Sequence, residues 1–319
     1  MVKHCVLLLA LAAAHSADAA ASKAHARTES DRYAAWVAQA AQVLGARADA
    51  NSLAAAAALT VTRSELTALD LVARASELAP QNSAIGWLRL QLCALAPACD
   101  MRDTATVMRW VDPDNAAAWL PTLAVAERDK DTTEVDRVLA DMAREPHFDF
   151  YWNRIVVFMF DALDAARNEL SGGYAASDAA RYAAVIGIAG GEVIPPFAPL
   201  VDACRESAAY PERRDLCLRL SKTMQRGDTI AAQLMGFGIE KRLLTPDSKE
   251  VRAIAERRRV LEWRVAAAAR FDNPLLPWTK NARARARLAQ MRALPREEDV
   301  CLAILREHKM AVDPPEVHP

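Results

Sequence analysis

The cysteines are the residues whose spacing most clearly suggests chemistry in this 319-residue chain. Cys93 and Cys99 stand on either side of a short apolar corner between two expected helices. Cys204 and Cys217 flank a proline-containing turn in the same way, and Cys301 is left over. In an oxidising compartment each pair could close a helix–helix corner as a disulfide. Sequence alone does not fix the connectivity, and the alternative is that all of them are reduced core residues.

Motifs for metal binding or catalysis are missing from the sequence. No C-x-x-C occurs and the six histidines are scattered, so we expect no metal site. G-x-S-x-G, H-E-x-x-H, Walker and dinucleotide-binding glycine motifs do not occur either. We therefore identify no catalytic residue and expect no cofactor. An acid–base pair assembled by the fold would escape such a search.

The composition indicates an all-α protein. The chain is 52% apolar and 25% charged, with only 10 glycines. Alanine, leucine and arginine are abundant, and all three favour helices. A net charge of −1 gives no reason to expect nucleic-acid binding. The run Arg257-Arg258-Arg259 could meet an anionic partner, but on a helix it spreads around the axis, so solvated surface is the favoured interpretation.

Residues 1–19 have the pattern of an export signal. Lys3 gives a positive start, Cys5–Ala14 is apolar, and Ala17-Asp18-Ala19 fits a cleavage site before Ala20. The alternative is a buried N-terminal helix. No later apolar stretch approaches the roughly 20 residues that span a bilayer. We expect an exported protein, periplasmic or extracellular, with no transmembrane segment after cleavage.

A repeat organises the next part of the chain. Three prolines are spaced by 33 and 33 residues, and a tryptophan follows each of them six or seven residues later. A fixed period of this length is typical of stacked helix pairs. The residues concerned are Pro80, Pro113 and Pro146 with Trp87, Trp119 and Trp152.

The copy Pro113-Asp114-Asn115 with Trp119 resembles the opening of a tetratricopeptide repeat (TPR), and the likeness covers about residues 63–170. Asn115 is expected to cap the helix that carries Trp119, and Pro121 must cost that helix a hydrogen bond or a kink. The resemblance implies a TPR-like helical-hairpin solenoid over residues 20–170. Because the proline period is lost after Ser171-Gly172-Gly173, residues 171–319 are expected to form a degenerate C-terminal helical bundle.

The TPR resemblance also implies a partner-binding groove, for which a protein or peptide is the expected ligand. For each position, the alternative is that the side chain simply packs or faces water. Phe150 is added because it lies in an aromatic run that could anchor an interface. The candidate binding residues are Leu120, Glu127, Arg128, Phe150, Asn153, Phe160 and Asp161.

Three functions remain open from the sequence. The first is an exported binding or scaffold module of the cell envelope. The second is an envelope enzyme of the polysaccharide-hydrolase type, with an unrecognised acidic catalytic residue. A deep cleft around a buried carboxylate would favour this function. The third is a structural subunit, which would be suggested if the chain's own helices fill the concave face of the solenoid.

Overall fold

The computed structural model describes residues 30–172, 174, 177–206, 211–271 and 281–315. In this part of the chain all regular structure is helical, apart from one isolated pair of bridged residues, which confirms the predicted all-α class. The predicted signal peptide lies outside the described residues. After a helix over residues 30–45, the helices are α2 (Ala50–Thr60), α3 (Glu65–Leu78), α4 (Ser83–Leu95), α5 (Met101–Val111), η1 (Ala116–Trp119), α6 (Leu120–Asp129), α7 (Thr132–Met142), α8 (Trp152–Ala165), α10 (Asp178–Glu192), α11 (Ala198–Glu206), α12 (Pro211–Met224), α13 (Ile230–Leu243), α14 (Lys249–Ala269), α15 (Asn281–Ala293) and α16 (Glu297–Glu307).

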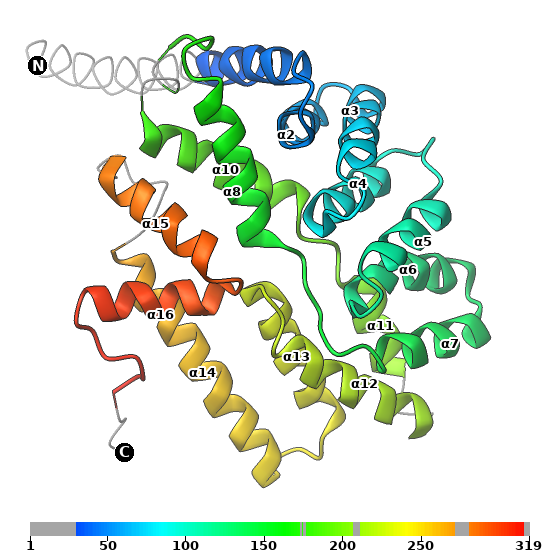
Figure 1. Ribbon diagram of the computed structural model, residues 1–319. Helices are drawn as coiled ribbons and strands as arrows, with labels where there is room; N and C mark the ends of the chain where they lie inside the picture. Colours follow the sequence, from blue (N-terminus) through cyan, green and yellow to red (C-terminus); the bar gives the residue numbers. More distant parts are fainter. Residues whose placement is uncertain (1–29, 173, 175–176, 207–210, 272–280, 316–319) are drawn as a thin grey trace, which may run out of the picture.

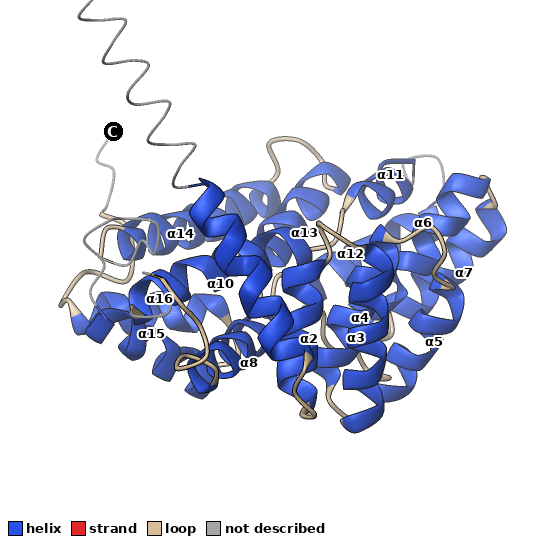
Figure 2. Cartoon of the chain, turned by 90° about the horizontal axis from the view of Figure 1, so that it is seen from above, coloured by secondary structure: helices blue, strands red, loops and turns tan. Residues whose placement is uncertain are grey.

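Helices α2 to α7 form three consecutive pairs, α2 with α3, α4 with α5, and α6 with α7. Neighbouring pairs also touch, because α3 packs on α4 and α5 packs on α6. Seen from above, α3, α4 and α5 stand beside one another (Figure 2). These helices start on local signals: Ser64, Asn82, Asp100 and Asp131 each accept a main-chain amide of the helix that follows.

Pro121 divides the helix that carries Trp119. A single 3-10 turn, η1, runs from Ala116 to Trp119, and α6 then starts at Leu120 with the proline in its first turn. A proline is tolerated there because the first amides of a helix have no intrahelical acceptor. Asn115 accepts the amide of Ala117 and so begins the 3-10 turn, as the sequence predicted.

After α7 the chain crosses the middle of the molecule. Residues 143–151 run from α7 back to α8, which packs against α2, α4, α10 and α15 (Figure 1). A second crossing, residues 193–197, leads from α10 to α11, and α11 packs on α6. The first helix of each pair is thus contacted by later helices of the same chain: α2 and α4 by α8, and α6 by α11.

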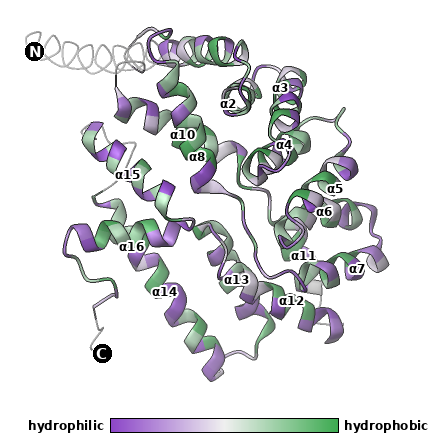
Figure 3. Ribbon diagram, in the orientation of Figure 1, coloured by the Kyte–Doolittle hydropathy of each residue, from purple (hydrophilic) through white to green (hydrophobic). Residues whose placement is uncertain are grey.

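The remaining helices close the molecule. α12 packs on α7 and α13, α13 on α14, and α14 on α16, while α15 returns to α8 and α10. One large hydrophobic core runs from Trp36 to Leu305, on both sides of the predicted boundary near residue 171, and a smaller cluster is formed by Phe237, Ile254 and Leu261. Figure 3 shows hydrophobic colour along α8 and α10, whereas α14 alternates between hydrophobic and hydrophilic.

The two predicted cysteine pairs are the disulfides of the structure. Cys93 is bonded to Cys99 with a Cα–Cα distance of 5.3 Å, and Cys204 to Cys217 with 5.7 Å. The first closes the corner between α4 and α5, and the second joins α11 to α12. The alternative of reduced core cysteines is therefore excluded for these four residues.

Candidate functional site

The first crossing meets a cluster of acidic side chains, of which Asp228 is buried and Asp149 and Glu297 are half-buried. Asp228, in the loop between α12 and α13, accepts the amide of Phe150 at 2.8 Å and that of Trp152 at 3.2 Å. Trp152 is the first residue of α8, and no neighbouring side chain caps this helix. Asp228 therefore caps a helix that begins 76 residues earlier. In return, Asp149 accepts the amide of Asp228 at 3.2 Å.

A third carboxyl group continues the cluster toward α16. Glu297 accepts the amide of Ile230, the first residue of α13, at 2.7 Å. The main-chain oxygen of Asp228 accepts the amide of Glu297 at 2.8 Å. Helix N-termini attract negative charge, so Asp228 at the start of α8 and Glu297 at the start of α13 lie where the helix dipole favours a carboxylate. Asp149, Asp228 and Glu297 together form what we call the acidic joint, which ties the crossing segment to α13 and α16.

Polar side chains on the other side of the crossing complete this arrangement. The Asn115 amide group donates to the oxygen of Asp149 at 2.9 Å and accepts the amide of Asp149 at 3.0 Å. The Tyr151 hydroxyl donates to Asp112, and His147 Nε2 lies 3.0 Å from the same carboxylate. Tyr151 has φ +58°, a left-handed conformation that costs a non-glycine residue on the order of 1–2 kcal/mol. These hydrogen bonds hold it there.

The pKa values in this region are shifted by burial. Burial and the neighbouring Asp149 raise the pKa of Asp228 to about 8, and burial raises the pKa of Glu297 to about 7. The pKa of Asp149 is raised as well, chiefly by burial. The hydrogen bond to Asp112 raises the pKa of His147, whereas Asp112 has its pKa lowered by His147 and Tyr151 against the effect of its own burial. Perturbed carboxyl groups of this kind are candidates for acid–base chemistry.

The geometry gives the acidic joint a structural role. Both carboxyl oxygens of Asp228 and one of Asp149 accept main-chain amides, and Asp228 is only 4% exposed. None of the described pockets is lined by Asp149, Asp228 or Glu297. A general acid must come within hydrogen-bond reach of its substrate. These groups instead replace the local helix caps that the crossing segment lacks.

A second candidate lies at the first disulfide corner. Here a pocket of about 350 Å³ is open to solvent and is lined mainly by aliphatic and proline side chains, with the disulfide in its wall. We call it the corner groove. Its walls are formed by Gln91, Cys93, Ala94, Ala96, Pro97, Cys99 and Met101 at the end of α4 and the start of α5, by Leu120, Pro121, Ala124, Val125 and Arg128 of α6, and by Pro195 and Pro196 of the second crossing.

The structure distributes the predicted binding residues between this groove and the core. Leu120 and Arg128 both line the corner groove, and Leu120 is largely buried while Arg128 is exposed and paired with Asp129 at 3.1 Å. Glu127, between them in α6, is half-buried.

The other four predicted residues lie at the first crossing and on α8. Phe150, Asn153 and Phe160 are buried, so they offer a partner no surface. Phe150 stacks on Trp87, and Asn153 donates to the oxygen of Leu294 at 2.8 Å. Asp161 is exposed and paired with Arg292 of α15. α8 is covered because the chain folds its later helices onto it, which the repeat pattern did not indicate.

A larger groove of about 580 Å³ lies between α12, α13, α14 and α16. Two ion pairs connect its lining residues, Arg257 with Glu240 and Arg264 with Glu298. The rest of the arginine run pairs along α14, Arg258 with Glu262 and Arg259 with Glu256. The run is thus ion-paired surface, as the sequence favoured.

Asp149 and Asp228 were not singled out from the sequence. The only signal was the tripeptide Gly227-Asp228-Thr229, in which Thr229 is a recognisable helix cap and Asp228 stands beside it. Gly227 has a reason in the structure, because a Cβ there would lie 2.6 Å from the oxygen of Phe148. The loop can approach the crossing segment only through glycine.

No protein-family model, no curated protein and no solved structure matches this chain. Among the described residues no group of three or more metal-ligating side chains is suitably placed to hold a metal ion. No helix in the described ranges is both long and apolar enough to cross a bilayer.

Proposed function

We propose that the protein is an exported binding module that holds an apolar segment of another protein in the corner groove. The observation that carries the proposal is the open apolar surface beside α6, which remains between α6, the first disulfide corner and the second crossing although α11 packs on α6 and α12 on α7. Leu120 and Arg128, which the TPR resemblance implied as binding positions, border this surface. Aliphatic walls with a charged residue at the rim suit a peptide that buries a few apolar side chains.

A variant that places a charged side chain in the corner groove tests this function. Ala124 is half-buried on α6 and lines the groove, so Ala124→Glu would put a carboxylate against the partner's apolar side chains. Ala140→Glu is the matched control, because Ala140 is equally half-buried on α7 and does not line the described grooves. In a pull-down from the envelope fraction, we expect a partner that wild type and Ala140→Glu retain and Ala124→Glu loses. An identical set of partners for all three proteins would contradict the proposal.

Export is the second part of the proposed function. Two disulfides fit an oxidising compartment, and residues 1–19 have the order of an export signal. Mass analysis of the protein from its native source should place Ala20 at the N-terminus. A chain that still begins with Met1 would exclude cleavage at this site.

The enzyme alternative depends on the acidic joint. Asp228 and Glu297 have pKa values suited to a general acid near neutral pH, but they face main-chain amides rather than a described pocket.

The structural-subunit alternative is favoured by a different observation, the packing of α8 and α11 on the first helices of the pairs. It predicts that the groove variants change no interaction, so the pull-down above also decides between a subunit and a binding module.

A further inference from the structure

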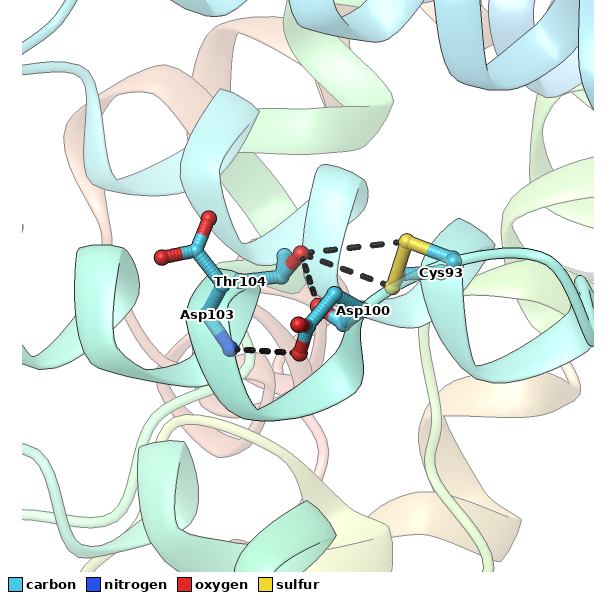
Figure 4. Close-up of a disulfide and its surroundings, with 5 residues drawn as sticks. Cys93, Asp100, Asp103 and Thr104 are labelled. Carbon is cyan, nitrogen blue, oxygen red and sulfur yellow. Dashed lines mark hydrogen bonds between the residues drawn. A yellow bond between two sulfur atoms is a disulfide. The ribbon is translucent and has the colours of Figure 1, made fainter.

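The second disulfide lies in a different setting from the first. The first closes a corner of the chain, where the Thr104 hydroxyl donates to the oxygen of Asp100 at 2.9 Å (Figure 4). The second, between Cys204 and Cys217, joins α11 to α12 in the core, and both of these helices pack on α13. A small cavity remains where the three helices meet.

This cavity has a volume of about 220 Å³ and is partly open to solvent. We call it the three-arginine cavity. α11 and α13 each contribute residues at positions i, i+3 and i+4, which lie on one face of a helix. Because the disulfide fixes α11 to α12, two of the three walls are held in place before a ligand binds. The lining residues are Val201, Cys204 and Arg205 of α11, Arg214 of α12, and Ile239, Arg242 and Leu243 of α13.

The charged residues of this lining are all arginines. Arg205 pairs at 2.7 Å with Asp202, which does not line the cavity, and Arg242 has no ion pair or hydrogen bond among the described residues. The half-buried Arg214 donates through Nε and Nη2 to the oxygen of Leu243, at 3.0 and 2.7 Å, and so caps the end of α13. That carbonyl carries no full charge. Of the three guanidinium groups, one therefore has a described carboxylate partner.

Elsewhere the protein pairs its buried arginines with carboxylates. Arg213, the neighbour of Arg214, pairs with Asp136 of α7, and Arg181 pairs with Asp178. A cation that loses water without gaining a counter-charge is unfavourable, so an anion in the three-arginine cavity would be stabilised. A planar guanidinium offers paired donors that match the two oxygens of a carboxylate. The charge and the donor geometry thus favour a carboxylate ligand.

The remainder of the lining selects the body of the ligand. Val201, Ile239 and Leu243 are aliphatic, and Cys204 adds a disulfide sulfur. An apolar protein cavity of about 150 Å³ can hold benzene, so a cavity of about 220 Å³ has room for a short hydrocarbon chain. Aliphatic walls gain free energy by covering such a chain and gain none from an inorganic anion.

From this arrangement we propose that the three-arginine cavity binds an aliphatic carboxylate. Its charged group meets the arginines, and its hydrocarbon chain lies between α11 and α13. A free fatty acid and the C-terminal leucine of a peptide both carry this chemistry. The cavity is separate from the corner groove, so the inference does not depend on the proposed binding of a protein partner.

Isothermal titration calorimetry of the mature chain with octanoate tests the inference. At about 0.15 M salt, which screens distant charges, we expect octanoate to bind with a Kd below about 1 mM. Octan-1-ol lacks the charge and acetate lacks the chain, so each should bind at least about tenfold more weakly. N-acetylleucine represents a peptide terminus, and the tighter of the two carboxylates identifies the source. Equal affinity for octan-1-ol, or displacement of octanoate by equimolar inorganic phosphate, would overturn the inference.

A pair of variants assigns the ligand to this cavity. Arg242→Gln removes an exposed charge that lines it and should weaken octanoate binding about three- to fivefold. Lys241→Gln removes the same charge from the neighbouring exposed position, which lines none of the described pockets, and should leave the affinity unchanged. Because both positions are exposed, neither substitution should unfold the protein. Unchanged affinity in Arg242→Gln, or equal losses in the two variants, would contradict binding at the three-arginine cavity.

Discussion

The acidic joint and the corner groove both contain reactive side chains, and the structure uses them in opposite ways. In the joint, carboxyl oxygens are occupied by main-chain amides and the pKa shifts follow from burial. In the groove, apolar walls and the half-exposed Cys99 are left without cover. The carboxyl groups with raised pKa values thus lie where the crossing segment is fixed to the rest of the protein. The uncovered surface is where we propose that the protein binds another molecule.

The largest expected effect is the loss of the long-range cap. Asp228→Ala leaves the buried amides of Phe150 and Trp152 without acceptors, so the free energy of unfolding should fall by about 3–5 kcal/mol. Asp131→Ala removes a local cap of α7 and should cost about 1 kcal/mol. Urea denaturation compares the two. Equal losses would mean that the acidic joint does not hold the crossing segment.

A glycine at the joint gives the next effect. Gly227→Ala places a Cβ 2.6 Å from the oxygen of Phe148, and the main chain must shift at a cost of about 1–3 kcal/mol. Gly238→Ala is the control, because no neighbouring atom lies within 4 Å of its Cβ and alanine favours the interior of α13. Thermal unfolding should show a lower melting temperature for the first variant and an equal or higher one for the second. A lower melting temperature for Gly238→Ala than for Gly227→Ala would contradict a close contact between Gly227 and Phe148.

Because the carboxyl pKa values of the acidic joint are raised, the protein should become less stable as pH rises. The pKa of Asp228 rises from its ordinary 3.8 to about 8, so between these values the folded chain holds a proton that the unfolded chain has lost. The free energy of unfolding therefore falls as pH rises from about 4 to about 8, by up to about 1.4 kcal/mol per pH unit for each such proton. The raised pKa of His147 acts in the same direction as pH rises past its ordinary 6.5.

Replacing the titrating group sharpens this prediction. Asp228→Asn keeps one acceptor oxygen but cannot ionise, so denaturation across the same pH range should give a flatter profile. The lowered pKa of Asp112 adds stability that is lost only as pH falls below its ordinary 3.8, outside this window. Stability that increases from pH 5 to pH 8 in the wild type would contradict the assignment.

The smallest effect on the fold is expected at the groove. Ala124→Glu changes a half-buried position at an open surface, so we expect a loss of unfolding free energy below about 1 kcal/mol together with loss of the partner. Circular dichroism and urea denaturation check the fold beside the pull-down. A variant that unfolds would assign Ala124 to the core rather than to a binding surface.

Local features of the fold could be read from the sequence. Asn115 caps the turn before α6, Pro121 divides that helix, and both disulfides close the corners that their spacing suggested. Each depends on residues within a few positions of one another. The TPR family remains a prediction, although helices pair and stack through α7.

The long-range features could not be read in this way. The repeat, carried past Pro146, placed Asn153 and Phe160 in a groove, and the aromatic run suggested Phe150 as an interface anchor. The chain instead crosses back after α7, and all three side chains are buried. Asp228 caps a helix that begins 76 residues earlier, and no local pattern encodes that distance. A cap supplied by a remote loop is visible only once the fold is known.

The most direct test of the account is a photo-crosslink from the groove in the native cell. A photoreactive phenylalanine replaces Val125, which lines the corner groove, and in a separate strain it replaces Arg258, exposed on α14. The account predicts a discrete crosslinked partner from position 125 and none from position 258. No adduct at position 125, or the same adducts from both positions, would contradict the claim that the corner groove is the binding site.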